Sequence, residues 1–129
     1  MKKSFVIFLI LITVLACKKL KFAPEGPTDV RVKNVSTLQF NELTVNTSGG
    51  VHNMGTIIPG DTSEYFRFEI AYSKAEISAM INGIFYTTGS VNVTYMNYIG
   101  QMKITYLVDV SGNMLEIKDL IPEEPLVLK

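Results

Sequence analysis

Cysteine and histidine occur once each in the 129-residue sequence, as Cys17 and His52, and tryptophan does not occur at all. A single cysteine excludes an intramolecular disulfide, so a folded domain of this chain has to rely on its apolar core and its sheet hydrogen bonds. One cysteine and one histidine also exclude a zinc site built from several such ligands. The length is sufficient for one domain of ordinary size and too short for two.

An excess of positive charge is missing as well. The sequence has 12 basic and 12 acidic side chains, and two of the basic ones, Lys2 and Lys3, lie at its N-terminal end. A protein that binds nucleic acid needs a basic face to neutralise the phosphates. The near-neutral balance therefore argues against nucleic acid as a partner.

The longest apolar run lies near the N-terminus and directly precedes the cysteine. It covers residues 5–16 and follows two lysines. A positive start and an apolar run of this length are typical of a secretory signal peptide, whereas a bilayer-spanning helix needs ~20 apolar residues. We therefore interpret residues 1–16 as a leader. A transmembrane anchor followed by stop-transfer lysines is the alternative.

The run ends in Val14-Leu15-Ala16-Cys17, which resembles the lipobox of bacterial lipoproteins: a branched aliphatic residue, a tolerant position, a small residue and the cysteine. Leu15 departs from the alanine or serine that is commoner there. In that family the leader is cut between the positions of Ala16 and Cys17, the thiol receives a diacylglyceryl group, and the new amine is acylated, for instance with palmitate. Two or more acyl chains anchor a protein stably, whereas one binds only marginally. The resemblance thus implies lipidation at Cys17.

Residues 17–27 carry two prolines, a glycine and three lysines, and they show neither a β nor a helical period. We expect a flexible tether between the lipid and the domain. The residue after the cysteine is Lys18, not the aspartate that retains lipoproteins in the inner membrane of enteric bacteria, and the acidic surface-export signal of some Bacteroidetes lipoproteins is absent. By resemblance, the anchor lies in the outer membrane and the domain faces the periplasm.

From Thr28 onward, apolar residues recur mostly at every second position, as they do in half-buried strands. The clearest alternation covers residues 65–72, and further strands are expected in residues 91–95 and 102–110. Residues 73–80 fit either a strand or a single helical turn. Between residues 28 and 121 we expect an almost wholly β structure in two packed sheets, with seven side chains mostly buried: Phe40, Phe66, Phe68, Ile70, Ile104, Tyr106 and Val108.

Turn residues separate these segments. Asn82-Gly83 between apolar residues predicts a two-residue hairpin, because both positions need a positive φ. A shift of the apolar phase at Asn41-Glu42 predicts a bend or bulge. Residues 122–125 contain two prolines and are expected to form a loop, with a short edge strand at residues 126–128.

About eight short strands without a convincing helix are typical of a β-sandwich, which we expect over residues 28–129. The disulfide and core tryptophan of antibody domains are absent, so the prediction is immunoglobulin-like in architecture only. A small β-barrel and a transthyretin-like sandwich are the alternatives. With the segments NTSGG (46–50) and GDTSEY (60–65), the lipobox and the tether resemble small single-domain lipoproteins of the Bacteroidetes. That resemblance implies no particular activity.

Catalytic chemistry would have to use His52. A triad would combine it with Ser48 or Ser63 as nucleophile and Asp61 as orienting acid. The chain has no Gly-x-Ser-x-Gly nucleophile elbow, so we expect His52 to lie on a loop or strand edge and predict no catalytic residues and no enzyme activity.

The acidic residues are scattered, and Asp61-Thr62-Ser63-Glu64 lacks the spacing of an EF-hand loop. Glu123 and Glu124 are expected on a solvated loop, where no defined separation is held. We therefore predict neither a metal site nor a cofactor.

Tyr95 and Tyr98 are the candidate binding residues. They lie three residues apart and so fall out of the two-residue strand period, which lets one of them point outward. Exposed tyrosines are frequent anchors of interfaces. We expect a membrane-tethered binding or assembly module that meets an envelope protein or a glycan at the sheet surface. A purely structural envelope lipoprotein is the second interpretation, and an enzyme using His52 is the third.

Overall fold

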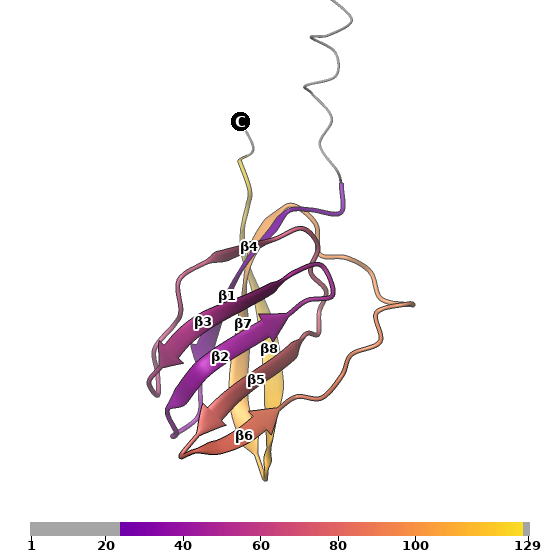
Figure 1. Ribbon diagram of the computed structural model, residues 1–129. Helices are drawn as coiled ribbons and strands as arrows, with labels where there is room; N and C mark the ends of the chain where they lie inside the picture. Colours follow the sequence, from indigo (N-terminus) through magenta and orange to yellow (C-terminus); the bar gives the residue numbers. More distant parts are fainter. Residues whose placement is uncertain (1–23, 128–129) are drawn as a thin grey trace, which may run out of the picture.

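The computed structural model describes residues 24–127, which form eight β-strands and no helix (Figure 1). Sheet I has the strand order β4-β1-β7-β8, and sheet II has the order β3-β2-β5-β6. The predicted all-β sandwich is confirmed, and because both sheets are open it is not a closed barrel. The strands are β1 (Thr28–Asn34), β2 (Phe40–Asn46), β3 (Val51–Ile57), β4 (Phe66–Phe68), β5 (Glu76–Ile81), β6 (Ile84–Thr87), β7 (Met102–Ser111) and β8 (Met114–Pro125).

The chain changes sheets after its first strand. β1 lies in sheet I and runs parallel to β7, from the pair Asp29–Lys103 to the pair Asn34–Val108, whereas β2 lies in sheet II. Immunoglobulin constant domains keep their first two strands in one sheet. The likeness to them is therefore one of two-sheet architecture.

The inner faces of the sheets carry the apolar residues that the two-residue period predicts. In β1, Val30 and Val32 are fully buried, while Arg31 between them is half-buried on the outer face. Five of the seven predicted core residues are buried, namely Phe40, Phe68, Ile104, Tyr106 and Val108. Complete burial of one such side chain stabilises the fold by ~1.5–3 kcal/mol.

Phe66 and Ile70 are less buried than these five residues, and Phe66 packs against the edge of the core. The predicted strand at residues 65–72 is also shorter, because β4 ends at Phe68. β4 is an edge strand of sheet I, so no neighbouring strand covers its outer edge and the residues around it stay partly open to solvent. The predicted alternation holds through β4, since Phe68 is buried while Arg67 and Glu69 are exposed, and it ends there, because Ala71 is fully buried.

Both predicted local features of sheet II are present. Asn82 has a φ of 51° and Gly83 a φ of 78°, and they join β5 to β6 through the pair Ile81–Ile84. At the predicted bend, the register of β2 shifts against both of its neighbours, and Glu42 has a φ of 49°. This is a β-bulge, which explains the change of apolar phase in the sequence.

Two other segments differ from the expectation. Residues 91–95 form no strand, because their only backbone bond is local, from Met96 N to Val93 O at 3.0 Å. Residues 122–125 are the end of β8, where Pro122 pairs with Ile104. Proline is tolerated there because β8 is an edge strand, whose open side requires no N–H donor. Residues 76–80 belong to β5, which excludes the helical turn for them.

Tyr106 is the largest fully buried side chain, and its hydroxyl donates to the Tyr72 carbonyl. Burial raises the pKa of this phenol well above its ordinary value of ~10. The folded state thus holds the proton more tightly than the unfolded chain does. The resulting stabilisation is complete below pH ~10 and is lost as the pH rises toward the folded-state pKa.

We expect Tyr106→Phe to lower the free energy of unfolding at pH 7 by about 1–2 kcal/mol, because the Tyr72 carbonyl loses its donor. Above pH ~10 the difference from wild type should narrow, because phenylalanine has no proton to lose. Urea unfolding at pH 7 and pH 10.5 measures both values. Tyr72→Phe, which keeps the accepting carbonyl, is the control. If wild type and Tyr106→Phe differed in unfolding free energy by the same amount at both pH values, the raised pKa of Tyr106 in the folded state would be contradicted.

Candidate functional site

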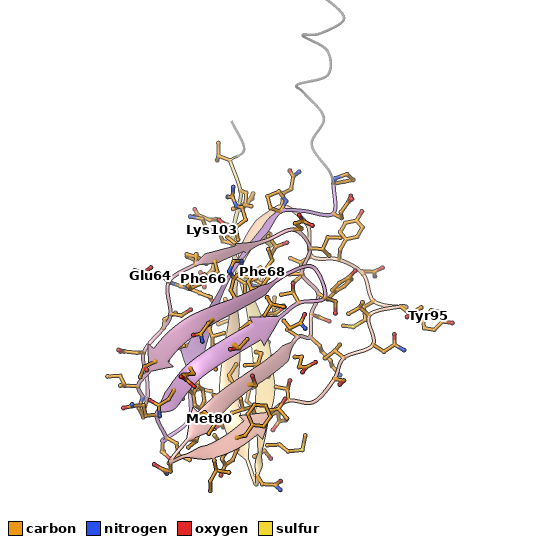
Figure 2. All side chains as sticks on the ribbon, viewed as in Figure 1. Glu64, Phe66, Phe68, Met80, Tyr95 and Lys103 are labelled. Carbon is orange, nitrogen blue, oxygen red and sulfur yellow. The ribbon has the colours of Figure 1, made fainter. Side chains whose placement is uncertain are left out.

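The connection between β6 and β7, residues 88–101, projects away from the two sheets (Figure 1). Tyr95 lies at its outer end and is 97% exposed (Figure 2). Tyr98 is 51% exposed. The structure therefore places both predicted tyrosines in solvent on a single loop.

This loop is held by its own hydrogen bonds. Asn92 Oδ1 accepts from the backbone N of Thr94 at 3.0 Å and from its hydroxyl at 2.6 Å, and these bonds shape the turn that carries Tyr95. Nearer the base, Tyr98 forms a β-bridge with Tyr72. A tip that is already ordered loses less conformational entropy when it binds.

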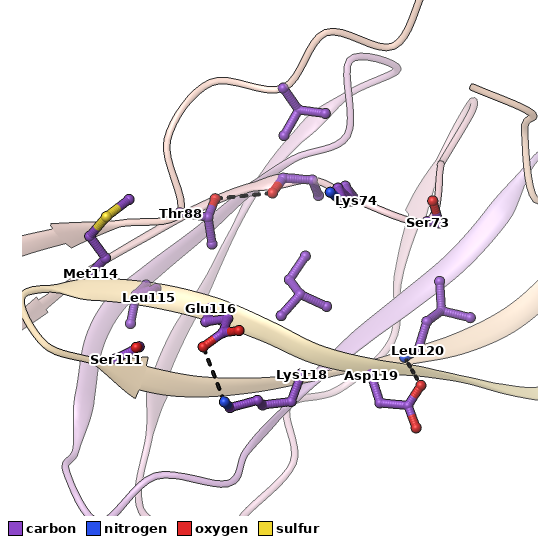
Figure 3. Close-up of a pocket in the computed structure, with 13 residues that line it drawn as sticks. Ser73, Lys74, Thr88, Ser111, Met114, Leu115, Glu116, Lys118, Asp119 and Leu120 are labelled. Carbon is purple, nitrogen blue, oxygen red and sulfur yellow. Dashed lines mark hydrogen bonds and ion pairs between the residues drawn. The ribbon is translucent and has the colours of Figure 1, made fainter. Parts of the chain in front are cut away.

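The base of the loop borders an open groove of about 680 Å³ (Figure 3). One wall is β8, from Met114 to Leu120, and the other consists of residues 73–75 together with Thr88 and Val91. Two parts of this second wall are joined by a hydrogen bond, which Thr88 Oγ1 donates to the Ala75 carbonyl at 3.1 Å.

The floor of the groove is apolar and its rim is charged. Ala75 and Leu115 line it and are each 2% exposed. Glu116 and Lys118 stand on the rim and pair with each other at 3.1 Å. An extended segment with an apolar residue and flanking polar groups fits such a groove, which is open to solvent along β8.

His52 lies in β3 at the opposite side of the sandwich from the β6–β7 loop, beside β4. Its ring contacts Phe66 and Phe68, with centroids 5.4 and 4.8 Å away, and its Nε2 donates to the Arg67 carbonyl at 2.8 Å. It thus links β3 of sheet II to β4 of sheet I. Within residues 24–127, no hydrogen bond joins it to the candidate partners Ser48, Ser63 and Asp61.

The sequence predicted Glu123 and Glu124 on a solvated loop, but the structure places both on β8. Glu123 accepts hydrogen bonds from Thr105 Oγ1 at 2.9 Å and from Arg31 Nη2 at 3.3 Å. The Thr105 hydroxyl, and after it the Arg31 guanidinium, hold the pKa of Glu123 below its ordinary value. Glu124 pairs with Lys103 at 3.2 Å.

These groups belong to a network on the outer face of sheet I. Arg31 and Lys103 both lie over the Tyr65 ring, 4.7 and 5.3 Å from its centroid, in cation–π contact. Arg67 forms a two-pronged pair with Asp29, at 2.8 and 3.2 Å, which raises the pKa of the guanidinium. Because each of these cations has a carboxylate partner, the network joins β1, β4, β7 and β8 and is not a free anion site.

In the described part of the chain, no three histidine, cysteine, aspartate or glutamate side chains come together as a metal site would require. Ala16 and Cys17, the predicted cleavage and lipidation residues, lie outside the described residues. None of the segments in residues 24–127 is a helix that could span a bilayer.

Sequence reasoning missed one surface. The outer face of sheet II collects amide and hydroxyl side chains from two pairs of consecutive strands, β2 with β3 and β5 with β6, which the pairing of β2 with β5 brings together. In the sequence, these polar residues alternate with apolar ones in each strand, which indicates that they face outward. That they form one row across the sheet follows only from the strand register.

No protein-family model matches the sequence, and no curated protein matches it. A solved structure from Bacteroides uniformis, described as a "putative cell adhesion protein", resembles this chain with a TM-score of 0.41 and 9% sequence identity. The similarity covers 76% of this chain and 50% of the other, so the chain spans about half the length of that protein.

Proposed function

We propose that this chain is a lipid-anchored binding or assembly module of the bacterial envelope that meets a partner protein through the β6–β7 loop. The observation that carries the proposal is Tyr95, which is 97% exposed at the outer end of an internally hydrogen-bonded loop. Tyrosine in such a position supplies a large contact area at a low entropic cost and is enriched among interface anchors.

The surroundings of Tyr95 support a protein partner. Tyr98 adds a second exposed ring on the same loop, and the groove at the base offers an apolar floor formed by Ala75 and Leu115. A partner that covers the tip can therefore also place a side chain or an extended segment in the groove. The lipobox-like Val14-Leu15-Ala16-Cys17 supports the membrane anchor, with the tether of residues 17–27 between the lipid and the domain.

Site-specific photocrosslinking in the cells that produce the protein tests this function. A photoreactive residue at the exposed position Asn97, beside Tyr95, is expected to give a discrete protein adduct, and Tyr95→Ala should reduce its yield at least about tenfold. The matched control is the same photoreactive residue at Ile58, which is 49% exposed at the turn after β3.

Three results would contradict the proposal: no adduct from position 97, the same adducts from position 58, or an adduct that Tyr95→Ala leaves unchanged. Any of these would favour a structural lipoprotein that has no partner at this loop. Mass spectrometry of the adduct identifies the partner.

A further inference from the structure

The outer faces of the two sheets differ in charge. The four strands of sheet II contain no lysine or arginine, and their acidic residues are Glu42 and Glu76. Sheet I, in contrast, carries the ionic network around Tyr65 on its outer face. In the view of Figure 1, sheet II lies in front of β7 and β8, so its nearly uncharged outer face is turned toward the reader.

Neutral polar side chains are aligned across this face. A single row of directly paired residues crosses all four strands from β3 to β6: Asn53, Thr44, Ser78 and Thr87. Val45 and Ile77, which neighbour two members of the row in sequence, are fully buried, so the row itself points to solvent. Since neighbouring strands lie ~4.8 Å apart, the row is about 14 Å long.

Three asparagines on this face present amide donors. In each, Oδ1 accepts a hydrogen bond from a residue two positions away, at 2.8–2.9 Å: Asn41, Asn46 and Asn53. Their Nδ2 groups donate to no other residue in the described part of the chain. In Asn46 and Asn53 a backbone N–H holds the oxygen, so the NH₂ group is left as a donor with little further loss of side-chain freedom, whereas in Asn41 the oxygen accepts from the exposed Gln39 side chain.

An aromatic ring completes the surface at one end. Phe85 of β6 is 62% exposed and lies opposite Met80 of β5, which Figure 2 labels on sheet II. Met80 in turn lies opposite Asn41 of β2, so the ring and one of the amides belong to a second row beside the first. A flat apolar patch next to amide donors suits a ligand that has both C–H faces and oxygen acceptors.

The geometry points to the outer face of sheet II as a binding surface for a neutral polysaccharide. Sugar hydroxyls can accept from the asparagine amides and the Ser78 hydroxyl and can donate to the Thr44 hydroxyl, whose own hydrogen goes to the Glu42 carbonyl, while a sugar ring can stack on Phe85. An anionic polymer would meet Glu42 and Glu76 without a compensating cation. A protein interface would need the tyrosine, tryptophan or arginine anchors that this face lacks.

Affinity electrophoresis of the full chain in mild detergent tests the inference. Native gels contain dextran, mannan, starch or xyloglucan as neutral polymers and alginate as an anionic one, and mobility is expressed relative to a gel without polymer. We expect at least one neutral polymer to slow the protein and alginate to leave its mobility unchanged. Asn53→Asp should weaken the retardation about tenfold, because it replaces the donor Nδ2 by an oxygen while keeping the oxygen that accepts from Gly55 N.

Asn92→Asp is the matched control. It makes the same chemical change at a residue whose Oδ1 is also held locally, but on the β6–β7 loop, and it should bind like wild type. Phe85→Ala removes an exposed ring and should weaken binding without lowering thermal stability. No retardation by any neutral polymer, equal retardation by alginate, or equal losses in Asn53→Asp and Asn92→Asp would overturn the inference. Because this face and the β6–β7 loop use different residues, the two proposals fail independently.

Discussion

Replacing Asn34 by alanine is expected to lower the free energy of unfolding by about 3 kcal/mol, against a total of ~5–15 kcal/mol for a domain of this kind. Asn34 ends β1 and is fully buried. Its Nδ2 donates to the carbonyls of Leu38 at 2.7 Å and Ile57 at 2.9 Å, and its Oδ1 accepts from the backbone N and the hydroxyl of Ser36. These are the four hydrogen bonds that a primary amide can make.

The expected loss is large because Asn34 joins segments that are distant in sequence. Its amide connects the end of β1 in sheet I to the end of β3 in sheet II at Ile57. Its backbone holds the turn after β3 as well, since Asn34 N donates to Asp61 O at 2.9 Å and Asn34 O accepts from Gly60 N at 2.8 Å. Alanine at this position would remove the side-chain partner of the Leu38 and Ile57 carbonyls and of the Ser36 N–H. Water cannot easily replace the amide at this buried site.

Asn92→Ala is the matched control, and urea denaturation is the measurement. Asn92 makes the same local motif, in which its Oδ1 accepts from the backbone N and the hydroxyl of Thr94, but it is exposed and its Nδ2 donates to no other described residue. We expect its loss to cost less than ~1 kcal/mol. Equal shifts of the urea midpoint for Asn34→Ala and Asn92→Ala would show that the buried amide contributes no more than the local turn.

The same two asparagines illustrate what could be predicted from the sequence. Asn34-Val35-Ser36 and Asn92-Val93-Thr94 are nearly identical tripeptides, yet one is a buried link between sheets and the other is part of an exposed loop. The difference depends on which distant carbonyls lie beside the amide. Local pattern carries no information about that, because it is decided by how the two sheets pack.

Features that depend on a few adjacent residues were predictable. The hairpin at Asn82-Gly83 follows from the need for two positive φ values, and the bulge at Glu42 follows from a change of apolar phase within one strand. One exposed tyrosine was expected for a similar reason, since Tyr95 and Tyr98 lie three residues apart, and the structure exposes both. The predicted strand at residues 91–95 was wrong because an alternating segment becomes a strand only where another strand pairs with it.

Features that depend on strand order were not predictable. The parallel pairing of β1 with β7 brings Arg31 beside Thr105, and the pairing of β7 with β8 then brings Glu123 to both of them. This is why two glutamates between prolines belong to a paired edge strand here. The aligned row on sheet II has the same origin, because each member comes from a different strand and a shift of one residue would turn it inward.

The proposed membrane anchor depends on a single side chain, Cys17. According to the lipobox resemblance, the sulfur of Cys17 carries the diacylglyceryl group, and the chain has no second cysteine that could take its place. Without acyl chains, the remaining attraction would come from the three lysines of the tether, at ~1 kcal/mol each near an anionic surface. That attraction is screened by salt, whereas acyl-chain insertion is not.

Cys17→Ser is therefore expected to move the protein almost completely from the membrane fraction to the soluble fraction after a high-salt wash, or to leave an uncut precursor. Mass spectrometry of the wild-type protein should find an N-terminal acylated Cys17 and no residues 1–16. Leu15→Ala is the control, because it changes the same motif toward the commoner residue and should keep the anchor. A Cys17→Ser protein that stays in the salt-washed membrane with its leader removed, or a wild-type N-terminus other than acylated Cys17, would exclude lipidation as the anchor. The proposed binding surfaces on the β6–β7 loop and on sheet II do not depend on this anchor, and their tests would still stand.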